Sequence, residues 1–269
     1  MIRTANPRIR AIGIVVPARD EEAHIQRCLR GLASALEQSP RGLACAVCLV
    51  LDRCTDRTPE LALSELARLH VRGTALPVQV LYNDRRATVG ALRDAGLRRA
   101  LRRLPEGPAA ATWLLSTDAD TTVEPGWVVD HIRHADAGAD AVAGLADLDD
   151  PDSLGPHGRR RYAGILAAGM HDDRHTHVYG ANLGVRADAY LDVGGFPSVA
   201  TGEDQQLLAR LRAAGHRIAT PTDVRVRTSS RLHGRATGGL AELLRGLPMT
   251  AESITAESIT AEPVPAPAT

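Results

Sequence analysis

The chain has 269 residues and carries 32 arginines, no lysine and 32 acidic residues, so its formal net charge is zero. Apolar residues make up 44% and charged residues 24%, which is ordinary globular usage and excludes collagen-like, disulfide-scaffold and wholly disordered chains. Zero net charge and only seven aromatic residues (two Trp, four Tyr and one Phe) argue against a nucleic-acid-binding protein.

The N-terminal half alternates short apolar runs with helical patterns. The runs that predict strands are Ala11–Pro17, Ala44–Leu51, Val78–Leu81 and Thr112–Ser116. The segments that predict helices are Glu21–Leu36, Thr58–His70 and Val89–Leu104. Because each strand is a continuous apolar run, the pattern indicates an α/β fold with a parallel sheet covered on both faces. Ligands of such sheets bind beyond the carboxyl ends of the strands, so the loops that follow the strands are the candidate sites.

The regular alternation fades after about residue 120. The expected elements there are a strand over Ala139–Leu145, a loop over Ala146–Arg161, a helix over Tyr162–Met170, a helix over Glu203–Ala214 and a strand over Arg217–Val226. From Pro248 a repeated Thr-Ala-Glu-Ser-Ile unit and alternating Pro-Ala predict a disordered tail. This tail holds three glutamates and no arginine, so the rest of the chain carries a formal charge of +3, from 32 arginines and 29 acids.

The longest early apolar run, Ala11–Val16, is too short for a signal peptide or for a membrane helix of about 20 residues. We therefore expect a cytoplasmic protein with no integral membrane segment. The pair Cys45 and Cys48 has CxxC spacing, but it lies within the apolar run Leu43–Leu51 and no second pair accompanies it. We expect these thiols to be buried small hydrophobes, not zinc ligands or a redox pair.

Three acidic groups lie at positions where ligand binding, metal binding or catalysis is expected. Asp52 ends a strand, where a carboxylate can accept hydrogen bonds from a base or ribose, while Asp56 four residues later can cap the next helix. Asp118 and Asp120 follow the fourth strand with one residue between them, a spacing that can grip Mg²⁺ or Mn²⁺ through oxygen ligands. Glu203 and Asp204 precede a helix, where they can complement its dipole or supply a general base.

Seven motifs occur in a fixed order along the chain. They are Ile14-Val-Val-Pro-Ala-Arg-Asp-Glu-Glu, Leu51-Asp-Arg-Cys-Thr-Asp-Arg-Thr, Val89-Gly-Ala-Leu-Arg-Asp-Ala-Gly, Thr117-Asp-Ala-Asp, Gly180-Ala-Asn-Leu-Gly-Val-Arg, Val193-Gly-Gly-Phe-Pro and Gly202-Glu-Asp. Over about residues 10 to 215 the chain resembles the family-2 nucleotide-sugar glycosyltransferases of the GT-A fold. The resemblance implies one continuous domain in which a Rossmann-like nucleotide-binding parallel sheet is fused to a smaller, acceptor-binding mixed sheet. It places the nucleotide-sugar half at residues 1–120, the acceptor-binding and catalytic half at 121–247, and the tail at 248–269.

The resemblance also implies roles for individual residues. The residues expected to bind the donor nucleotide sugar are Pro17, Ala18, Asp20, Glu22, Asp52, Arg93, Thr117, Asp118, Asn182 and Arg235. The residues expected to hold a Mn²⁺ or Mg²⁺ cofactor are Asp118, Asp120 and His233. Asp204, accompanied by Glu203, is expected to be the catalytic base that deprotonates an acceptor hydroxyl. Glycines such as Gly180 and Gly195 are expected either to shape the sugar pocket or to serve ordinary turns.

The implied function is metal-dependent transfer of one sugar, with a UDP-sugar favoured as donor, to a small-molecule or natural-product hydroxyl with inversion. The chain departs from the family in the Ala18-Arg-Asp loop, in the single acid at Asp52 and in Cys54, which replaces a serine-like residue. A retaining enzyme similar to glucosyl-phosphoglycerate synthases stays open, because it would not need Asp204 as base. A nucleotidyltransferase and a catalytically silent nucleotide-sugar-binding protein are further alternatives. The segment His171–His177 is expected to be a surface loop or to line the acceptor pocket.

Overall fold

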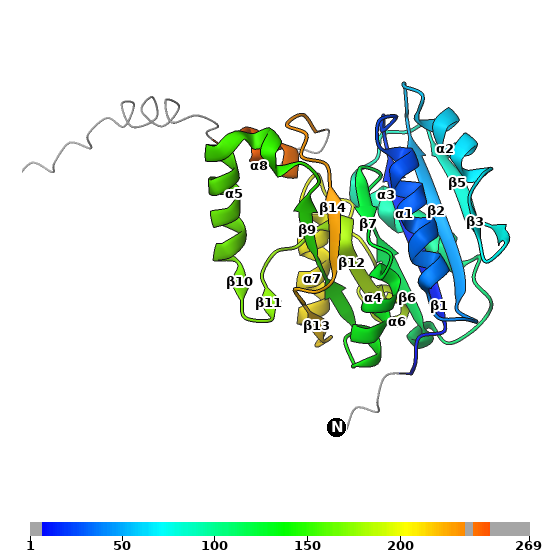
Figure 1. Ribbon diagram of the computed structural model, residues 1–269. Helices are drawn as coiled ribbons and strands as arrows, with labels where there is room; N and C mark the ends of the chain where they lie inside the picture. Colours follow the sequence, from blue (N-terminus) through cyan, green and yellow to red (C-terminus); the bar gives the residue numbers. More distant parts are fainter. Residues whose placement is uncertain (1–6, 235–238, 248–269) are drawn as a thin grey trace, which may run out of the picture.

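The computed structural model describes residues 7–234 and 239–247 of the chain. Within these residues a seven-stranded sheet, a three-stranded sheet and two short hairpins combine with helices (Figure 1). The tail predicted from Pro248 and the side chain of Arg235 lie outside the described residues. In the described part of the chain, every helix is too short or too polar to span a bilayer.

The large sheet has the strand order β13–β8–β12–β6–β1–β2–β5. Its strands are β1 (Ala11–Ala18), β2 (Ala44–Asp52), β5 (Val78–Asn83), β6 (Thr112–Ser116), β8 (Ala141–Ala143), β12 (Leu183–Arg186) and β13 (Ile218–Ala219). The predicted parallel arrangement is confirmed for β6, β1, β2 and β5. Strand β12 runs antiparallel to both β6 and β8, so the complete sheet is mixed.

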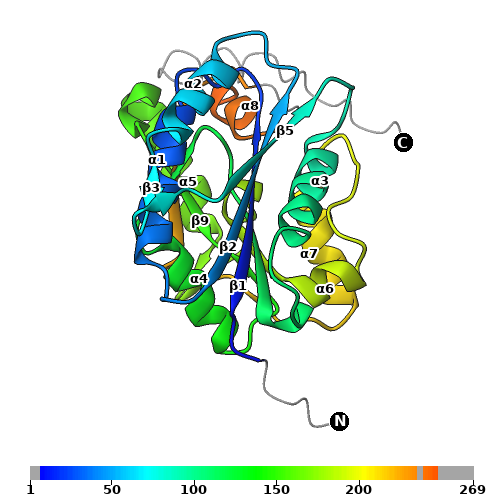
Figure 2. The ribbon, with the colours of Figure 1, turned by 90° about the vertical axis from the view of Figure 1, so that its right-hand side faces the viewer.

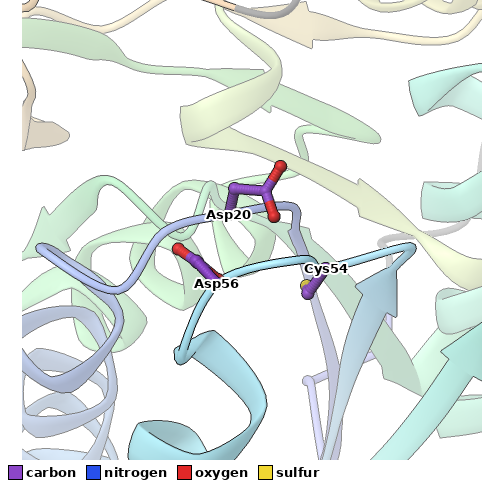
Figure 3. Close-up of side chains that lie close together, drawn as sticks. All are labelled: Asp20, Cys54 and Asp56. Atoms are coloured by element: carbon purple, nitrogen blue, oxygen red, sulfur yellow. The ribbon is translucent and has the colours of Figure 1, made fainter.

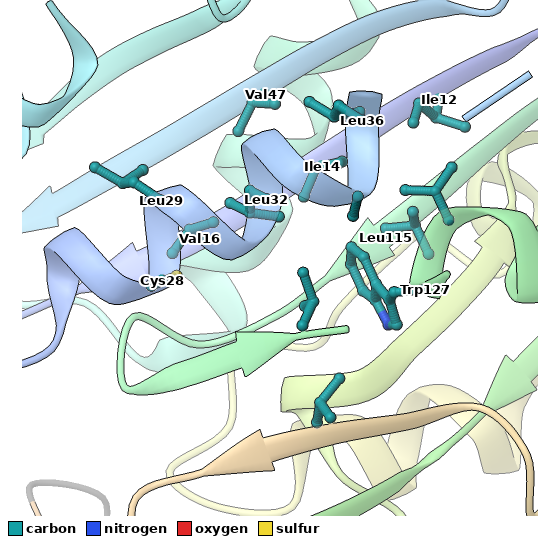
Figure 4. Packing of buried hydrophobic residues seen from close by; sticks show 14 of the residues in the cluster. Ile12, Ile14, Val16, Cys28, Leu29, Leu32, Leu36, Val47, Leu115 and Trp127 are labelled. Carbon is teal, nitrogen blue, oxygen red and sulfur yellow. The ribbon is translucent and has the colours of Figure 1, made fainter. Parts of the chain in front are cut away.

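Helices cover both faces of this sheet, as the continuous apolar strands predict. One face carries α1 (Ile25–Gln38), α2 (Thr58–Leu66) and α4 (Trp127–Asp136), and the other carries α3 (Val89–Leu101), α6 (Ala187–Asp192) and α7 (Glu203–Ala213). Figure 2 shows the sheet between the two helical layers. Alternate side chains of β1 serve the two cores: Ile14 and Val16 pack under α1, whereas Val15 packs under α3 (Figure 4).

The smaller sheet consists of β7 (Thr121–Val123), β14 (Arg225–Thr228) and β9 (Leu145–Leu148), and it is mixed as the resemblance implies. The prediction of one strand over 139–145 is wrong, because Gly144 separates β8 in the large sheet from β9 in the small one. At Gly144 a Cβ atom would lie 2.2 Å from the side-chain nitrogen of Asn182 and 2.5 Å from the carbonyl oxygen of Val224. Only glycine permits so close a backbone approach, and the chain changes its partner strand there.

The predicted strand over 217–226 is also two strands, β13 and β14, in different sheets. Pro221 lies between them, and its missing N–H interrupts a ladder. The predicted helix over 58–70 ends at Leu66, after which β3 (His70–Val71) and β4 (Thr74–Ala75) form a hairpin. Helix α1 begins at Ile25, four residues later than predicted.

The predicted loop over 146–161 is wrong as well. It contains the rest of β9, a 3₁₀ turn (Pro151–Leu154) and the first half of α5 (Gly155–Ala168), a helix that stands away from the sheets (Figure 1). Only Gly158 and Tyr162 of α5 are buried, so its sequence lacks the apolar stripe that identifies most helices. It packs through a small cluster that includes Leu154 and Leu244, the latter from α8 (Leu240–Arg245).

The histidine-rich segment forms the short hairpin of β10 (Met170–His171) and β11 (Arg174–His175). Two further 3₁₀ turns, Ala109–Ala111 and Gly180–Asn182, precede β6 and β12. All four cysteines are free thiols. Cys48 is fully buried and Cys45 half-buried, and burial raises the pKa of each thiol to about 11, which confirms that both are packed, protonated groups.

Candidate active site

The carboxyl ends of four parallel strands meet at one edge of the large sheet, as predicted. The register aligns Ala18 of β1 with Leu51 of β2, Asp52 with Asn83 at the end of β5, and Val15 with Ser116 at the end of β6. The loops that follow these strands therefore lie side by side. The strand register brings these loops together, so the acidic side chains that they carry converge on one region.

Carboxylates brace the first two loops against each other. The Asp20 carboxylate accepts hydrogen bonds from the Thr55 amide at 2.6 Å and from the Thr55 hydroxyl at 3.1 Å, and the Glu22 amide donates to Asp56 at 3.0 Å. The Thr55 amide holds the pKa of Asp20 below its ordinary value. Figure 3 shows Asp20, Asp56 and Cys54 close together where the two loops touch.

These contacts refine the roles expected of the first loop. Asp20 and Glu22 were expected to bind the donor, and the structure shows them holding the loop that follows β2; Glu22 accepts from the Arg57 amide at 3.2 Å. Pro17 and Ala18 lie inside β1, not in the loop. The expected helix cap at Asp56 is present as a hydrogen bond from the Thr58 amide at 2.9 Å.

Asp52 lies at the end of β2 and is only 3% exposed. Its carboxylate accepts from the Asn83 side-chain amide at 2.6 Å and from the Arg53 guanidinium at 3.2 Å, while Arg19 lies 3.9 Å away. Arg53 itself has a φ of 45°, a left-handed conformation that turns the chain sharply out of the strand. Asp52 is thus a fixed acceptor at the strand end, with cations on its exposed side.

Asp120 lies in a second acidic group. Its carboxylate is 2.8 Å from the Arg231 guanidinium, which also makes two parallel hydrogen bonds to Glu21 at 2.6 and 2.8 Å. Burial raises the pKa of Asp120 to about 7, and the nearby Asp118 adds to the effect while Arg231 opposes it. A carboxylate in this setting gains from a cation, because its charge is desolvated and crowded by a like charge.

Arg93 of α3 connects this acidic group with α7. It is 3% exposed, and its guanidinium donates to the Ser116 hydroxyl at 2.6 Å, to Asp118 at 2.7 Å and to Glu203 at 3.4 Å. Its carbon atom Cζ lies 5.9 Å from the centre of the Phe196 ring. The resemblance placed Arg93 beside the donor base, whereas the structure shows it as a buried cation that orients carboxylates from two distant segments.

The start of α7 lies next to this cation. Gly202, with a φ of 72°, turns the chain into the helix, and Glu203 is 7% exposed with its pKa raised by burial. The Asp204 carboxylate accepts from the Gly180 amide at 2.8 Å and from the Gln205 amide at 2.7 Å. A Cβ atom at Gly180 would lie 2.7 Å from an Arg93 nitrogen, so this glycine lets the turn before β12 pass directly over the guanidinium.

Two predicted site residues do not join this group. Asn182 is fully buried, and its side chain donates to the carbonyl oxygens of Leu145 and Val224 at 2.8 and 3.0 Å and accepts from the Trp127 indole at 2.8 Å. It therefore ties the two sheets together where they separate at Gly144. His233 is exposed, and the group of three possible metal ligands found among the described residues consists of Asp20, Cys54 and Asp56 and includes neither His233 nor the Asp118–Asp120 pair.

Thr117 is fully buried just before the acidic pair, and its amide donates to the carbonyl oxygen of Val15 at 3.2 Å. The residues that sequence reasoning missed are Glu21, Ser116 and Arg231. Glu21 and Arg231 both lie in segments that the sequence analysis singled out, the Asp20-Glu-Glu loop and Arg231-Leu-His-Gly-Arg235. In both segments, however, neighbouring residues were assigned the binding roles. Nothing in the sequence signalled that these two residues, so far apart in the chain, would form a two-bond ion pair.

A sequence model of the family described as glycosyl transferase family 2 matches residues 13–193, more than half of the chain. The chain belongs to glycosyl transferase family 2. It is accordingly a glycosyltransferase, and the expected GT-A fold is confirmed by solved structures. No curated protein matches the chain in sequence.

The solved structures share the fold at low sequence identity. The mannosyltransferase PcManGT from Pyrobaculum calidifontis, in complex with GDP-Man and Mn²⁺, is 18% identical with a TM-score of 0.61 and covers 93% of this chain and 76% of its own. S. aureus TarS 1-349 in complex with UDP-GlcNAc is 19% identical with a TM-score of 0.56, over 84% of this chain and 60% of that one. GalNAc-T7 with UDP, GalNAc and Mn²⁺ is 16% identical with a TM-score of 0.59, over 82% and 44%. The chain thus spans about half to three quarters of these proteins.

Proposed function

We propose that this glycosyltransferase uses a divalent metal and transfers one sugar from a nucleoside-diphosphate sugar, with a UDP-sugar favoured, to a hydroxyl of a small molecule or natural product. The observation that carries the proposal is the Arg93 bridge, which joins Asp118 after β6 to Glu203 at the start of α7. It brings an acidic pair suited to a metal next to the start of α7, where Asp204, the proposed base, follows Glu203.

The donor side is supported by the shared edge of the sheet and by the comparisons. Asp52 presents a fixed acceptor at the end of β2, beside the loop that Asp20 and Glu22 brace. The solved relatives include complexes with GDP-Man and with UDP-GlcNAc. We propose that the nucleoside lies between Asp52 and the loop after β1, with its diphosphate directed toward Asp120.

The acidic pair fits a hard divalent cation. Asp118 and Asp120 offer carboxylate oxygens, the donors that Mn²⁺ and Mg²⁺ favour, and burial beside Asp118 raises the pKa of Asp120, so a divalent cation would stabilise its charged form. These two residues would hold the metal, with His233 as a proposed further ligand and Arg235 as a proposed partner of the diphosphate. A bound metal would supply positive charge to the departing diphosphate.

Asp204 is the proposed general base of an inverting reaction. Two backbone amides, from Gly180 and Gln205, donate to its carboxylate and hold it at the start of α7. It would take the proton of the acceptor hydroxyl while that oxygen attacks the anomeric carbon and the nucleoside diphosphate leaves from the opposite face. Glu203 faces Arg93 and is proposed to position that cation.

Binding of a panel of UDP-, GDP- and dTDP-sugars in the presence of Mn²⁺, followed by transfer or hydrolysis assays, tests the proposal. Asp120→Ala is expected to abolish metal-dependent turnover, whereas Asp130→Ala, which removes an exposed carboxylate from α4, is expected to leave it unchanged. If turnover survives both Asp120→Ala and EDTA, the metal assignment fails. If no nucleotide sugar binds, the donor assignment fails with it.

The stereochemistry has its own test. An inverting enzyme gives a product of opposite anomeric configuration to the donor, and Asp204→Asn then lowers kcat by several orders of magnitude, since the base is lost. A product with retained configuration, formed at a normal rate by Asp204→Asn, would show that the site works without this base.

A further inference from the structure

Arg231 is the one cation that reaches the acidic group from the C-terminal side of the described residues, directly after β14. Its guanidinium lies 2.8 Å from an Asp120 oxygen and forms a two-bond pair with Glu21. The side chains of Glu21 and Asp120 are 7% and 15% exposed, against 27% for Arg231. A partly exposed cation thus closes over two nearly buried acids that come from the ends of β1 and β6.

We propose that Arg231 is a resident counter-ion that occupies the cation position at Asp120 and must release this carboxylate before a divalent ion can bind there. This inference rests on the proposed metal site and adds to it a competing group supplied by the chain itself. The Arg231 guanidinium lies 2.8 Å from Asp120 Oδ2 and fills the space in front of this oxygen. A metal ligated through Oδ2 would lie next to the guanidinium and be repelled by its positive charge, so the two cations compete for this position.

The electrostatics of the group favour an exchange and not a permanent pair. A divalent ion carries twice the charge of a guanidinium, so at the same distance and effective dielectric constant it attracts the Asp120 carboxylate about twice as strongly. The Nη2 atom of Arg231 contacts both Asp120 and one Glu21 oxygen, while Nη1 donates to the other Glu21 oxygen. The guanidinium can therefore rotate about its Nη1 bond to Glu21, which moves Nη2 off Asp120 and leaves the arginine charge paired.

Arg93 provides the contrast within the same site. Its side chain is 4% exposed and holds Ser116, Asp118 and Glu203 from three directions, so nothing in its surroundings allows it to move aside. The two arginines thus differ in role: Arg93 contacts Oδ1 of Asp118 and stays in place, whereas Arg231 covers Asp120 until a divalent ion replaces it.

Direct Mn²⁺ binding tests this assignment without any donor or acceptor. We would titrate Mn²⁺ into the purified full chain and measure the free ion by electron paramagnetic resonance, comparing the wild type with Arg231→Gln. The substitution removes the competing charge, so Mn²⁺ affinity is expected to rise about tenfold or more. Arg227→Gln is the matched control, because Arg227 lies on β14 itself and pairs with the exposed Glu124 at 3.0 Å; its Mn²⁺ affinity should equal that of the wild type.

Thermal unfolding gives a second readout that keeps the test valid if Arg231→Gln lowers stability. Without metal this variant should unfold at a lower temperature than the wild type, because Glu21 and Asp120 lose their cation. Saturating Mn²⁺ should then raise its unfolding temperature by more than that of the wild type or of Arg227→Gln, since tighter binding to the folded state gives greater stabilisation.

The possible outcomes separate the two claims. Equal or weaker Mn²⁺ affinity in Arg231→Gln, with measurable binding in the wild type, would overturn the competition while leaving the metal site in place. Absence of Mn²⁺ binding in all three proteins would overturn both this inference and the metal-dependent part of the proposed function. Tighter binding in Arg231→Gln alone supports the exchange.

Discussion

Removal of the Arg93 cation is the most demanding test of the site. Arg93→Met keeps the length and apolar stem of the side chain but removes the guanidinium of a residue that is only 3% exposed. That guanidinium donates hydrogen bonds to Ser116, Asp118 and Glu203. Glu203, whose side chain is 9% exposed, then loses its cation inside the protein, and the buried Ser116 hydroxyl loses a donor. Breaking a buried ion pair on one side costs about 3–5 kcal/mol, because the remaining charge stays desolvated.

Urea unfolding at neutral pH measures this loss. With a slope of about 3 kcal/mol per molar urea, a loss of about 3–5 kcal/mol moves the midpoint down by about 1–2 M. The control is Arg98→Met on the same helix, since the Arg98 side chain is 39% exposed and pairs with Asp94 one turn away at 2.8 Å. An exposed pair of this kind contributes less than about 1 kcal/mol, so its midpoint should move little.

The pH dependence of the same variant checks the cause. In Arg93→Met the folded protein holds Glu203 with a pKa raised by burial and no longer lowered by the cation, so the folded state binds a proton more tightly than the unfolded state. Stability of the variant relative to wild type should therefore recover as the pH falls from 7 toward 4, where the acid becomes neutral. A midpoint within about 0.3 M of wild type at neutral pH, or a deficit that does not change with pH, would refute the account of Arg93 as a charge bridge.

Three further predictions follow from single contacts. In metal-free protein, Asp120→Asn should be more stable than wild type at pH 8 and lose that advantage toward pH 4, because a folded-state pKa raised to about 7 makes ionisation progressively unfavourable from about pH 4 up to 7; urea midpoints at both pH values check the sign. Gly180→Ala should lower the unfolding temperature, since its Cβ would press on Arg93, whereas Gly164→Ala on the open face of α5 should leave it unchanged or raise it slightly. Asn182→Ala should cost about 3 kcal/mol in urea unfolding, because the Leu145 and Val224 carbonyls each lose a donor and the buried Trp127 indole loses its acceptor, and nucleotide-sugar affinity should follow the fraction folded.

The N-terminal half of the fold was predictable because its strands are buried on both faces. Continuous apolar runs such as Ala44–Leu51 have few alternative explanations, and the helices between them carry regular apolar stripes. The second half of α5 lies within the helix predicted over 162–170, but its first half was missed for the opposite reason. That half is held by a few contacts around Leu154 with residues as distant as Leu244, so the composition of residues 155–161 does not indicate a helix.

The acidic members of the site were also predictable, because strand ends of a parallel sheet share one edge. Their partners were not. Whether Arg93 points toward a bound base or toward Asp118 depends on how α3 lies over β6 and on where α7 returns, a separation of 110 residues between Arg93 and Glu203. Asn182 was assigned to the donor pocket from its motif, whereas its place between the two sheets follows from the break at Gly144.

The all-arginine composition has a physical counterpart in this site. Arg93 and Arg231 each hold carboxylates from separate elements, and each does so through several nitrogens of one planar group, which a lysine ammonium could not match in geometry. Their different exposure then decides their behaviour. A cation enclosed on all sides can only orient its acids, whereas one that is 27% exposed and anchored by a second acid can yield its place to another cation and return. In this site, acids and arginines of opposite charge are therefore paired at close range, and the pair of Arg231 with Asp120 is the one that exchanges with a divalent ion.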